Sequence, residues 1–236
     1  MSQPNGPQHT GPKHIGIVAC SAEGAALCYR TICVEGAELF GPHNHPEVSM
    51  HTYSLATYMN HFHSGDWTSV ADLMVASAEK LASIGADFFI CPDNTIHRVF
   101  PQVRERSPRP WLHIAESVLK EAAKKGYKRV GLTGTKYLME SDVYPEHLLR
   151  PSAAERERIN AIIFDELVYG QFRPEALKYF QGVIQRMRDA GCDAVVLGCT
   201  EIPILVRPED SPLPVLDSTR LLARAALKKA QFALQC

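Results

Sequence analysis

The sequence of 236 residues has no long hydrophobic run and almost no net charge. None of its apolar stretches approaches the ~18 residues of a membrane-spanning helix, and no charged-then-apolar leader opens it. The formal net charge of -1 gives no reason to expect nucleic acid or an anionic membrane as a partner. These absences predict a protein that neither enters a membrane nor binds nucleic acid.

Paired-cysteine motifs are also missing. The seven cysteines are scattered without C-x-x-C spacing and their number is odd, so we expect no disulfide framework. Free thiols fit a reducing compartment, which predicts a cytoplasmic protein.

Signatures of cofactors and metals are absent as well. The turn at residues 20–24 lacks the glycine spacing of a dinucleotide loop or a P-loop. No lysine stands in a recognisable pyridoxal-phosphate setting, so we expect no cofactor. Five histidines cluster between residues 43 and 63, but no further ligands accompany them at a diagnostic spacing. We therefore expect no metal site.

Two similar segments, residues 85–95 and 191–200, organise what is present. Each opens with Gly-x-Asp, continues through a short apolar run and ends in a small polar cluster. The same offset separates Gly85 from Gly191 and Asp93 from Cys199. A short apolar run bounded by turn residues is typical of a strand buried in a parallel sheet. Functional groups of such sheets lie just past the carboxyl ends of the strands.

Strand and helix patterns alternate along almost the whole chain. Besides the two repeated segments, strands are expected at residues 14–19, 47–52, 111–114, 129–135 and 214–216. Helices are expected at residues 25–40, 67–84, 115–125, 152–168, 174–190 and 217–234. A loop is expected over residues 101–110. This alternation predicts an α/β fold of two pseudo-symmetric βα halves. Each half would hold a mainly parallel sheet flanked by helices, with an active cleft between the halves.

The domain organisation follows from this repeat. We expect a flexible tail over residues 1–13, because this segment is polar and rich in Gly, Pro and Gln. Residues 14–110 and 217–236 would form the first lobe, and residues 111–216 the second.

The two segments carry a resemblance to a known family. Residues 197–203 read Leu-Gly-Cys-Thr-Glu-Ile-Pro, which resembles the second cysteine motif of the aspartate/glutamate racemase superfamily. Residues 92–97 read Pro-Asp-Asn-Thr-Ile-His, which resembles the family's Pro-Cys-Asn-Thr-x-His motif. The glycine-rich first strand and residues 112–114 and 132–135 match in the same order. The resemblance therefore covers nearly the whole chain after residue 13.

One position departs from the family pattern. Asp93 stands where the family usually has its first catalytic cysteine. Cys91 lies two residues earlier, within the predicted strand, and we do not take it as a substitute.

The resemblance implies cofactor-independent racemisation of an amino acid, either acidic or otherwise small, in a homodimer. Such a reaction removes a proton from one face of the α-carbon and returns one to the other face, so two acid/base groups must flank the substrate. We identify Asp93 and Cys199 as these catalytic residues. Their reference pKa values, ~3.9 and ~8.5, differ widely, which favours divided roles as acid and base.

The substrate, a small carboxylate or amino acid, also needs donors for its carboxylate and for the negative charge of an enediolate intermediate. Asn94, Thr95 and Thr200 directly follow the two reactive positions. The resemblance adds Ser21, Thr133 and Thr135 as substrate-binding residues. Glu201 joins the predicted site as a group that binds or orients, with helix capping as its alternative.

Other interpretations remain open at this point. Asp93 could cap the following turn, as Asx-Asn-Thr segments often do, and Cys199 and Cys20 could simply pack as small hydrophobes. His97 could orient the cleft or be solvated. One alternative function is single-cysteine decarboxylation or isomerisation of a malonate- or maleate-like carboxylate through an enediolate. Another is a catalytically idle family member that binds a carboxylate.

Overall fold

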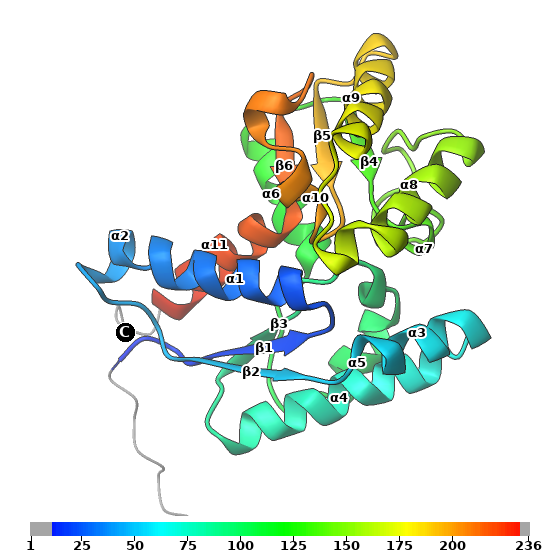
Figure 1. Cartoon of the computed structure of the whole chain (residues 1–236). Coiled ribbons are helices and arrows are strands. Elements are labelled where there is room, and N and C mark those ends of the chain that lie inside the picture. Colours follow the sequence, from blue (N-terminus) through cyan, green and yellow to red (C-terminus); the bar gives the residue numbers. More distant parts are fainter. Residues whose placement is uncertain (1–10, 232–236) are drawn as a thin grey trace, which may run out of the picture.

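A computed structural model describes residues 11–231, which form two three-stranded parallel sheets flanked by helices (Figure 1). The first sheet has the order β2-β1-β3 and the second the order β4-β5-β6. The strands are β1 (Ile15–Ala19), β2 (Val48–Thr52), β3 (Phe88–Ile90), β4 (Val130–Thr133), β5 (Ala194–Leu197) and β6 (Val215–Asp217). The predicted α/β class, with a parallel sheet in each half, is confirmed.

Helices cover both faces of the first sheet, as Figure 1 shows. One face packs against α1 (Ala22–Glu35) and α11 (Ser218–Gln231), and the other against α3 (Leu55–Ser64) and α4 (Trp67–Ser83). Alternate residues of β1 supply the two faces: Ile15 and Ile17 point to the first, and Val18 to the second. This period of two is what a strand buried on both sides requires.

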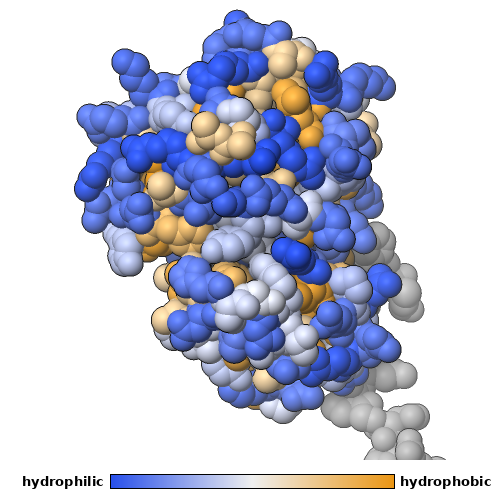
Figure 2. All heavy atoms as spheres, turned by 90° about the vertical axis from the view of Figure 1, so that its right-hand side faces the viewer, coloured by the Kyte–Doolittle hydropathy of each residue, from blue (hydrophilic) through white to orange (hydrophobic). Residues whose placement is uncertain are grey.

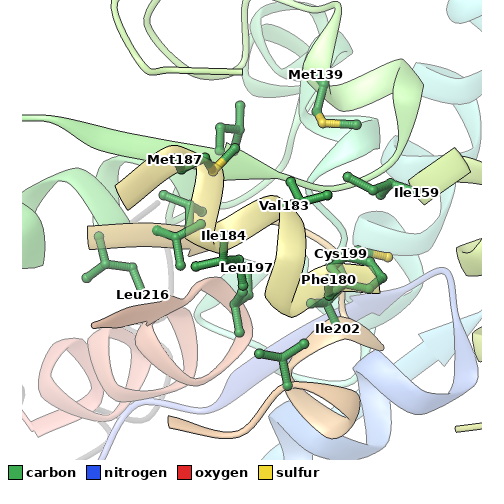
Figure 3. Packing of buried hydrophobic residues seen from close by; sticks show 14 of the residues in the cluster. Met139, Ile159, Phe180, Val183, Ile184, Met187, Leu197, Cys199, Ile202 and Leu216 are labelled. Atoms are coloured by element: carbon green, nitrogen blue, oxygen red, sulfur yellow. The ribbon is translucent and has the colours of Figure 1, made fainter. Parts of the chain in front are cut away.

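The second sheet is enclosed in the same way. Its hydrophobic cluster includes residues of α6 (Ile114–Lys124), α8 (Ala153–Asp165) and α9 (Pro174–Asp189). Phe180 of α9, Cys199 and Ile202 belong to this cluster (Figure 3). The remaining short elements are α2 (Ala37–Phe40), η1 (Thr95–Val99), α5 (Phe100–Arg106), α7 (Lys136–Met139), η2 (Leu167–Tyr169), α10 (Ile202–Leu205) and η3 (Pro208–Asp210).

The repeated Gly-x-Asp has the same structural role in both halves. Gly85 and Gly191 both adopt a positive φ, 97° and 89°, which ends the preceding helix at little steric expense. Asp87 then accepts the N–H of His14 at 2.8 Å, next to the start of β1. Asp193 accepts the N–H of Lys128 at 2.7 Å, just before β4. In each half the aspartate therefore links the outgoing strand to the start of its neighbour.

The connection between the halves differs from its prediction in two places. Residues 100–106 form α5 rather than a loop, because a proline in the first turn of a helix loses no bond that the helix would make there. Residues 111–114 do not form a strand. Trp111 makes a single parallel bridge to Phe89, and α6 already begins at Ile114. Its N-cap is His113, whose Nδ1 accepts the N–H of Ala115 at 3.1 Å.

The chain ends bear on two further predictions. Residues 1–10 of the predicted tail and residues 232–234 of the predicted last helix lie outside the described residues. Within the described part, the N–H of Lys13 donates to the carbonyl of Ala230 at 3.1 Å, so the last residue of the predicted tail contacts α11. The lobe boundaries at residues 110 and 216 stay a prediction.

The surface gives no sign of a membrane-spanning segment. Among residues 11–231, no helix is both long enough and apolar enough to cross a bilayer. The face in Figure 2 is mostly hydrophilic, and its hydrophobic atoms form separate patches.

Candidate active site

The candidate site lies where β3 and β5 end, one strand from each sheet. Asp93 follows β3, and its Oδ1 accepts the N–H of Thr95 at 2.9 Å and that of Ile96 at 3.4 Å. Asp93 thus makes the capping contacts expected of an Asx turn, yet its side chain stays only partly buried. Capping and a place in the site are therefore compatible.

Cys199 follows β5 and is paired with a carboxylate. Its thiol donates to Oε2 of Glu201 at 2.9 Å, and the hydroxyl of Thr200 donates to the same oxygen at 2.6 Å. Glu201 is only 2% exposed, so its carboxylate is held by buried donors rather than by water. The pairing makes Glu201 the direct neighbour of the Cys199 thiol.

Hydrogen bonds join predicted site residues across the two halves. The hydroxyls of Ser21 and Thr200 lie 3.0 Å apart, and those of Thr95 and Thr135 lie 2.9 Å apart. All four residues are buried. The strand ends of the two sheets therefore meet in one polar cluster.

Asn94 is held by two residues that the sequence did not point to. The hydroxyl of Tyr144 donates to Asn94 Oδ1 at 2.8 Å, and Asn94 Nδ2 donates to Ser218 Oγ at 2.9 Å. No local sequence pattern marks Tyr144 or Ser218 as a site residue. Thr133 differs from the other predicted residues, because its hydroxyl donates to the Val196 carbonyl at 2.8 Å within the second sheet.

The absence of a side chain at Gly24 lets α1 approach the second half. A Cβ atom there would lie 2.2 Å from Cγ2 and 2.3 Å from Cβ of Thr200. A residue with a Cβ atom would fit here only after a shift of the backbone. The contact between Ser21 and Thr200 therefore depends on glycine at this position.

The two candidate acid/base groups have strongly shifted pKa values. Burial, and secondly the charge of Glu201, raises the pKa of Asp93 to about 6. Burial and the negative charge of Glu201 also raise the pKa of the Cys199 thiol well above its ordinary value, and Asp93 adds to that shift. At neutral pH this environment favours a carboxylate at Asp93 and a protonated thiol at Cys199.

Cys20 is a further neighbour of Asp93. Burial, and secondly the charge of Asp93, raises the pKa of the Cys20 thiol well above its usual range. The sequence offered only a packing role for this residue. Its place at the end of β1 is the one signal that could have indicated proximity to the site.

His97 hydrogen-bonds the backbone of the turn that contains Asp93. Its Nδ1 donates to the Asp93 carbonyl at 2.7 Å, and its Nε2 accepts the N–H of Ile114 at 3.4 Å. Burial, and secondly His113, lowers the pKa of His97 to about 3, so the ring is neutral. His97 is thus an orienting residue rather than a solvated one.

A cavity adjoins this polar cluster. It has a volume of about 470 Å³ and is lined on one side by Cys20, Ser21 and Glu201. A larger hollow of about 780 Å³ lies between α6 and α11, but none of the predicted site residues lines it. In the described part of the chain, no three His, Cys, Asp or Glu side chains are grouped as a metal site.

The sequence and the fold both match a known family. The model of the Asp/Glu/hydantoin racemase family matches residues 17–226, which include both strand ends of the candidate site. The chain belongs to the Asp/Glu/hydantoin racemase family. The chain is 24% identical over 172 residues to the broad specificity amino-acid racemase RacX of Bacillus subtilis, covering 69% of this chain and 73% of RacX.

Solved structures of related proteins support the family assignment. A candidate Asp/Glu racemase from Yersinia pestis superposes with a TM-score of 0.83 at 28% identity, covering 94% of this chain and 100% of the other. An aspartate racemase homologue from Pyrococcus horikoshii superposes with a TM-score of 0.78 at 26% identity, covering 92% and 99%. This racemase-family member therefore shares its whole fold with these proteins.

Proposed function

We propose that this racemase-family protein is an isomerase that inverts the α-carbon of an amino acid without a cofactor. One observation carries the proposal: Asp93 and Cys199 follow equivalent strands of the two halves, and the Ser21–Thr200 and Thr95–Thr135 hydrogen bonds join these strand ends. A racemase needs two acid/base groups that reach the substrate from different sides. The likeness to RacX, a broad specificity amino-acid racemase, supports the same reaction class.

Asp93 and Cys199 have unequal roles in this proposal. Asp93, with a pKa of about 6, is ionised at neutral pH and takes the α-proton as a carboxylate. Cys199 is protonated beside Glu201 and delivers its thiol hydrogen to the opposite face of the carbanion. The site is then left with a protonated Asp93 and a Cys199 thiolate, and proton exchange with water restores the starting state. Running these steps backwards inverts the other enantiomer.

Hydroxyl and amide donors around the two groups serve the intermediate. Loss of the α-proton moves negative charge onto the substrate carboxylate, and preorganised donors stabilise that charge. Ser21, Asn94, Thr95, Thr135 and Thr200 bring such groups together from both halves. We assign carboxylate binding to them, and we give Thr133 a lesser part because its hydrogen is already donated to Val196.

The test is solvent-isotope exchange. Each single-enantiomer amino acid of a panel is incubated with the protein in deuterated water, and deuterium at the α-carbon is measured by mass spectrometry together with the enantiomer ratio. Exchange with inversion supports the racemase. If the folded wild-type protein exchanges the α-proton of no amino acid, the proposal is wrong and a carboxylate-binding role becomes the better account.

A second function has one specific observation in its favour. Cys199 is held as a protonated thiol by Glu201, so it alone could protonate an enediolate formed by decarboxylation of a malonate-like substrate. In that reaction Asp93 would need no proton-transfer role. Release of carbon dioxide from disubstituted malonates, retained in Asp93→Asn, would select this alternative.

Homodimerisation completes the proposal, because the family resemblance implies it. Sedimentation equilibrium of the purified protein tests it directly. A mass of one chain at all concentrations would contradict it.

A further inference from the structure

The lining of the cavity beside the candidate site contains polar and apolar residues. Cys20, Ser21 and Glu201 are among the polar ones. Glu201 accepts the thiol hydrogen of Cys199, and Ser21 hydrogen-bonds Thr200, the residue between them. The cavity therefore adjoins the chain segment that follows β5 and carries Cys199.

Most of the other lining residues are apolar. Met50 of β2 and Leu55 of α3 come from the first half, and Val168 of η2 comes from the second. Alanines of α1, Ala19 of β1, Thr52, Tyr53 and Glu23 complete the lining. The volume of about 470 Å³ falls within the range of small-molecule sites, roughly 300–1,000 Å³. The space suits a compact apolar group enclosed between the two halves.

Cations that could bind an anionic side chain are missing from this lining. Among the described residues, no Lys or Arg lines the cavity, whereas the carboxylates of Glu23 and Glu201 do. Lys80 touches one lining residue, because its Nζ lies 3.2 Å from the hydroxyl of Tyr53, but Lys80 itself is exposed and outside the lining. A carboxylate in the cavity would lose water, gain no positive partner and lie near two negative charges.

We propose that this cavity receives the side chain of the substrate, and that this side chain is uncharged and apolar, as in leucine or methionine, rather than acidic. This inference rests on the proposed racemase function and specifies its substrate class. Discrimination has two causes. Burying a hydrocarbon chain against the apolar lining residues is favourable, while the carboxylates repel the side chains of aspartate and glutamate. We expect kcat/KM for leucine and methionine to exceed that for aspartate and glutamate by at least about 100-fold.

The first experiment compares matched substrates. Deuterium exchange and inversion are measured for leucine, methionine, aspartate and glutamate as single enantiomers. Faster exchange of leucine or methionine supports the inference. Exchange of glutamate or aspartate at an equal or higher rate overturns it, although such a result would still support the proposed racemase.

A charge variant makes the second experiment. Met50→Arg places a cation in the apolar wall, on a half-exposed residue of an edge strand where the fold tolerates it. We expect glutamate turnover to rise at least about tenfold relative to leucine turnover. Val34→Arg is the matched control, because it adds the same charge on an exposed residue of α1 that does not line the cavity. Equal substrate ratios in Met50→Arg and the control would overturn the inference.

Binding separates this inference from the proposed function. If no amino acid exchanges its α-proton, the racemase proposal fails, and calorimetric titration with leucine and with glutamate then decides the cavity's preference. Binding of leucine alone supports an apolar side-chain site. Glutamate binding at equal strength, or no binding of either amino acid, overturns it.

Discussion

The thiol of Cys199 lies 2.9 Å from Oε2 of Glu201 and donates its hydrogen to that oxygen. Thr200 donates to the same oxygen at 2.6 Å, and Ser21 of the first half hydrogen-bonds Thr200 in turn. The reactive thiol is thus the end of a short chain of polar groups that crosses between the halves. The negative charge of Glu201 favours the thiol over the thiolate.

Glu201→Gln should therefore make Cys199 ionise more easily. Removing the charge eliminates the second-largest cause, after burial, of the raised thiol pKa. We expect the alkylation rate of Cys199 at neutral pH to rise at least about tenfold, because the pKa of the thiol falls. Peptide mapping after iodoacetamide treatment measures it, and Cys192, a buried cysteine outside the site, is the internal control. An unchanged rate would show that Glu201 does not control the thiol.

Substitutions at the two proposed proton carriers should change turnover in different ways. Cys199→Ala should reduce turnover by ~10²–10⁴-fold in both directions, since it removes one acid/base group. Asp93→Asn should slow α-proton removal from one enantiomer far more than from the other. Exchange without inversion can persist in that variant. If Asp93→Asn inverts both enantiomers at the wild-type rate, Asp93 transfers no proton and only caps the η1 helix.

The pH dependence of exchange provides a separate check on Asp93. Its pKa of about 6 means that the basic carboxylate forms as pH rises through that value. Exchange from the enantiomer served by Asp93 should therefore increase across pH 5 to 7, about one unit either side of the pKa, and then level off. This rise of the exchange rate with pH should be absent in Asp93→Asn. If the rise is still present after the substitution, it belongs to the titration of another group.

Asp93 should also lower the stability of the fold at neutral pH. Its folded-state pKa lies about two units above the unfolded value of 3.8, so its favourable contribution is complete below pH 3.8 and is lost as pH rises through about 6. At pH 7, Asp93→Asn should raise the free energy of unfolding by up to about 3 kcal/mol. At pH 3.5 the two proteins should have nearly equal stability. Urea unfolding at both pH values measures the difference, and an equal gain at both would exclude ionisation as the cause.

Gly24→Ala should disturb the contact between the halves. The added methyl would lie 2.2 Å from Thr200 Cγ2, and this overlap cannot be relieved at the flexible end of a side chain. We expect a loss of about 1–3 kcal/mol in the free energy of unfolding, together with reduced turnover. Gly182→Ala in α9 is the control, because its methyl would meet only the end of Arg186 at 3.5 Å. That substitution should be neutral or stabilising by about 0.5–1 kcal/mol.

Local patterns in the sequence were sufficient for much of the fold. The repeated Gly-x-Asp with its apolar run predicted β3 and β5, and the matching offset brought Asp93 and Cys199 to equivalent strand ends. These features depend on neighbours a few residues apart, and such spacing is visible in a sequence. Where a local signal was ambiguous, as for the proline-containing residues 101–106, the prediction of a loop was wrong.

The amino-acid sequence by itself determined the α/β class, the twofold repeat and the identity of the polar groups that follow the repeated strands. Only the tertiary structure decided which of those groups meet. Asn94 contacts Ser218, 124 residues away, and Cys20 became a neighbour of Asp93 although its local pattern indicated packing alone. Thr133, by contrast, directs its hydroxyl to a neighbouring strand. These outcomes depend on how two separately enclosed sheets pack, because contacts between the halves are set by long-range burial rather than by periodicity along the chain.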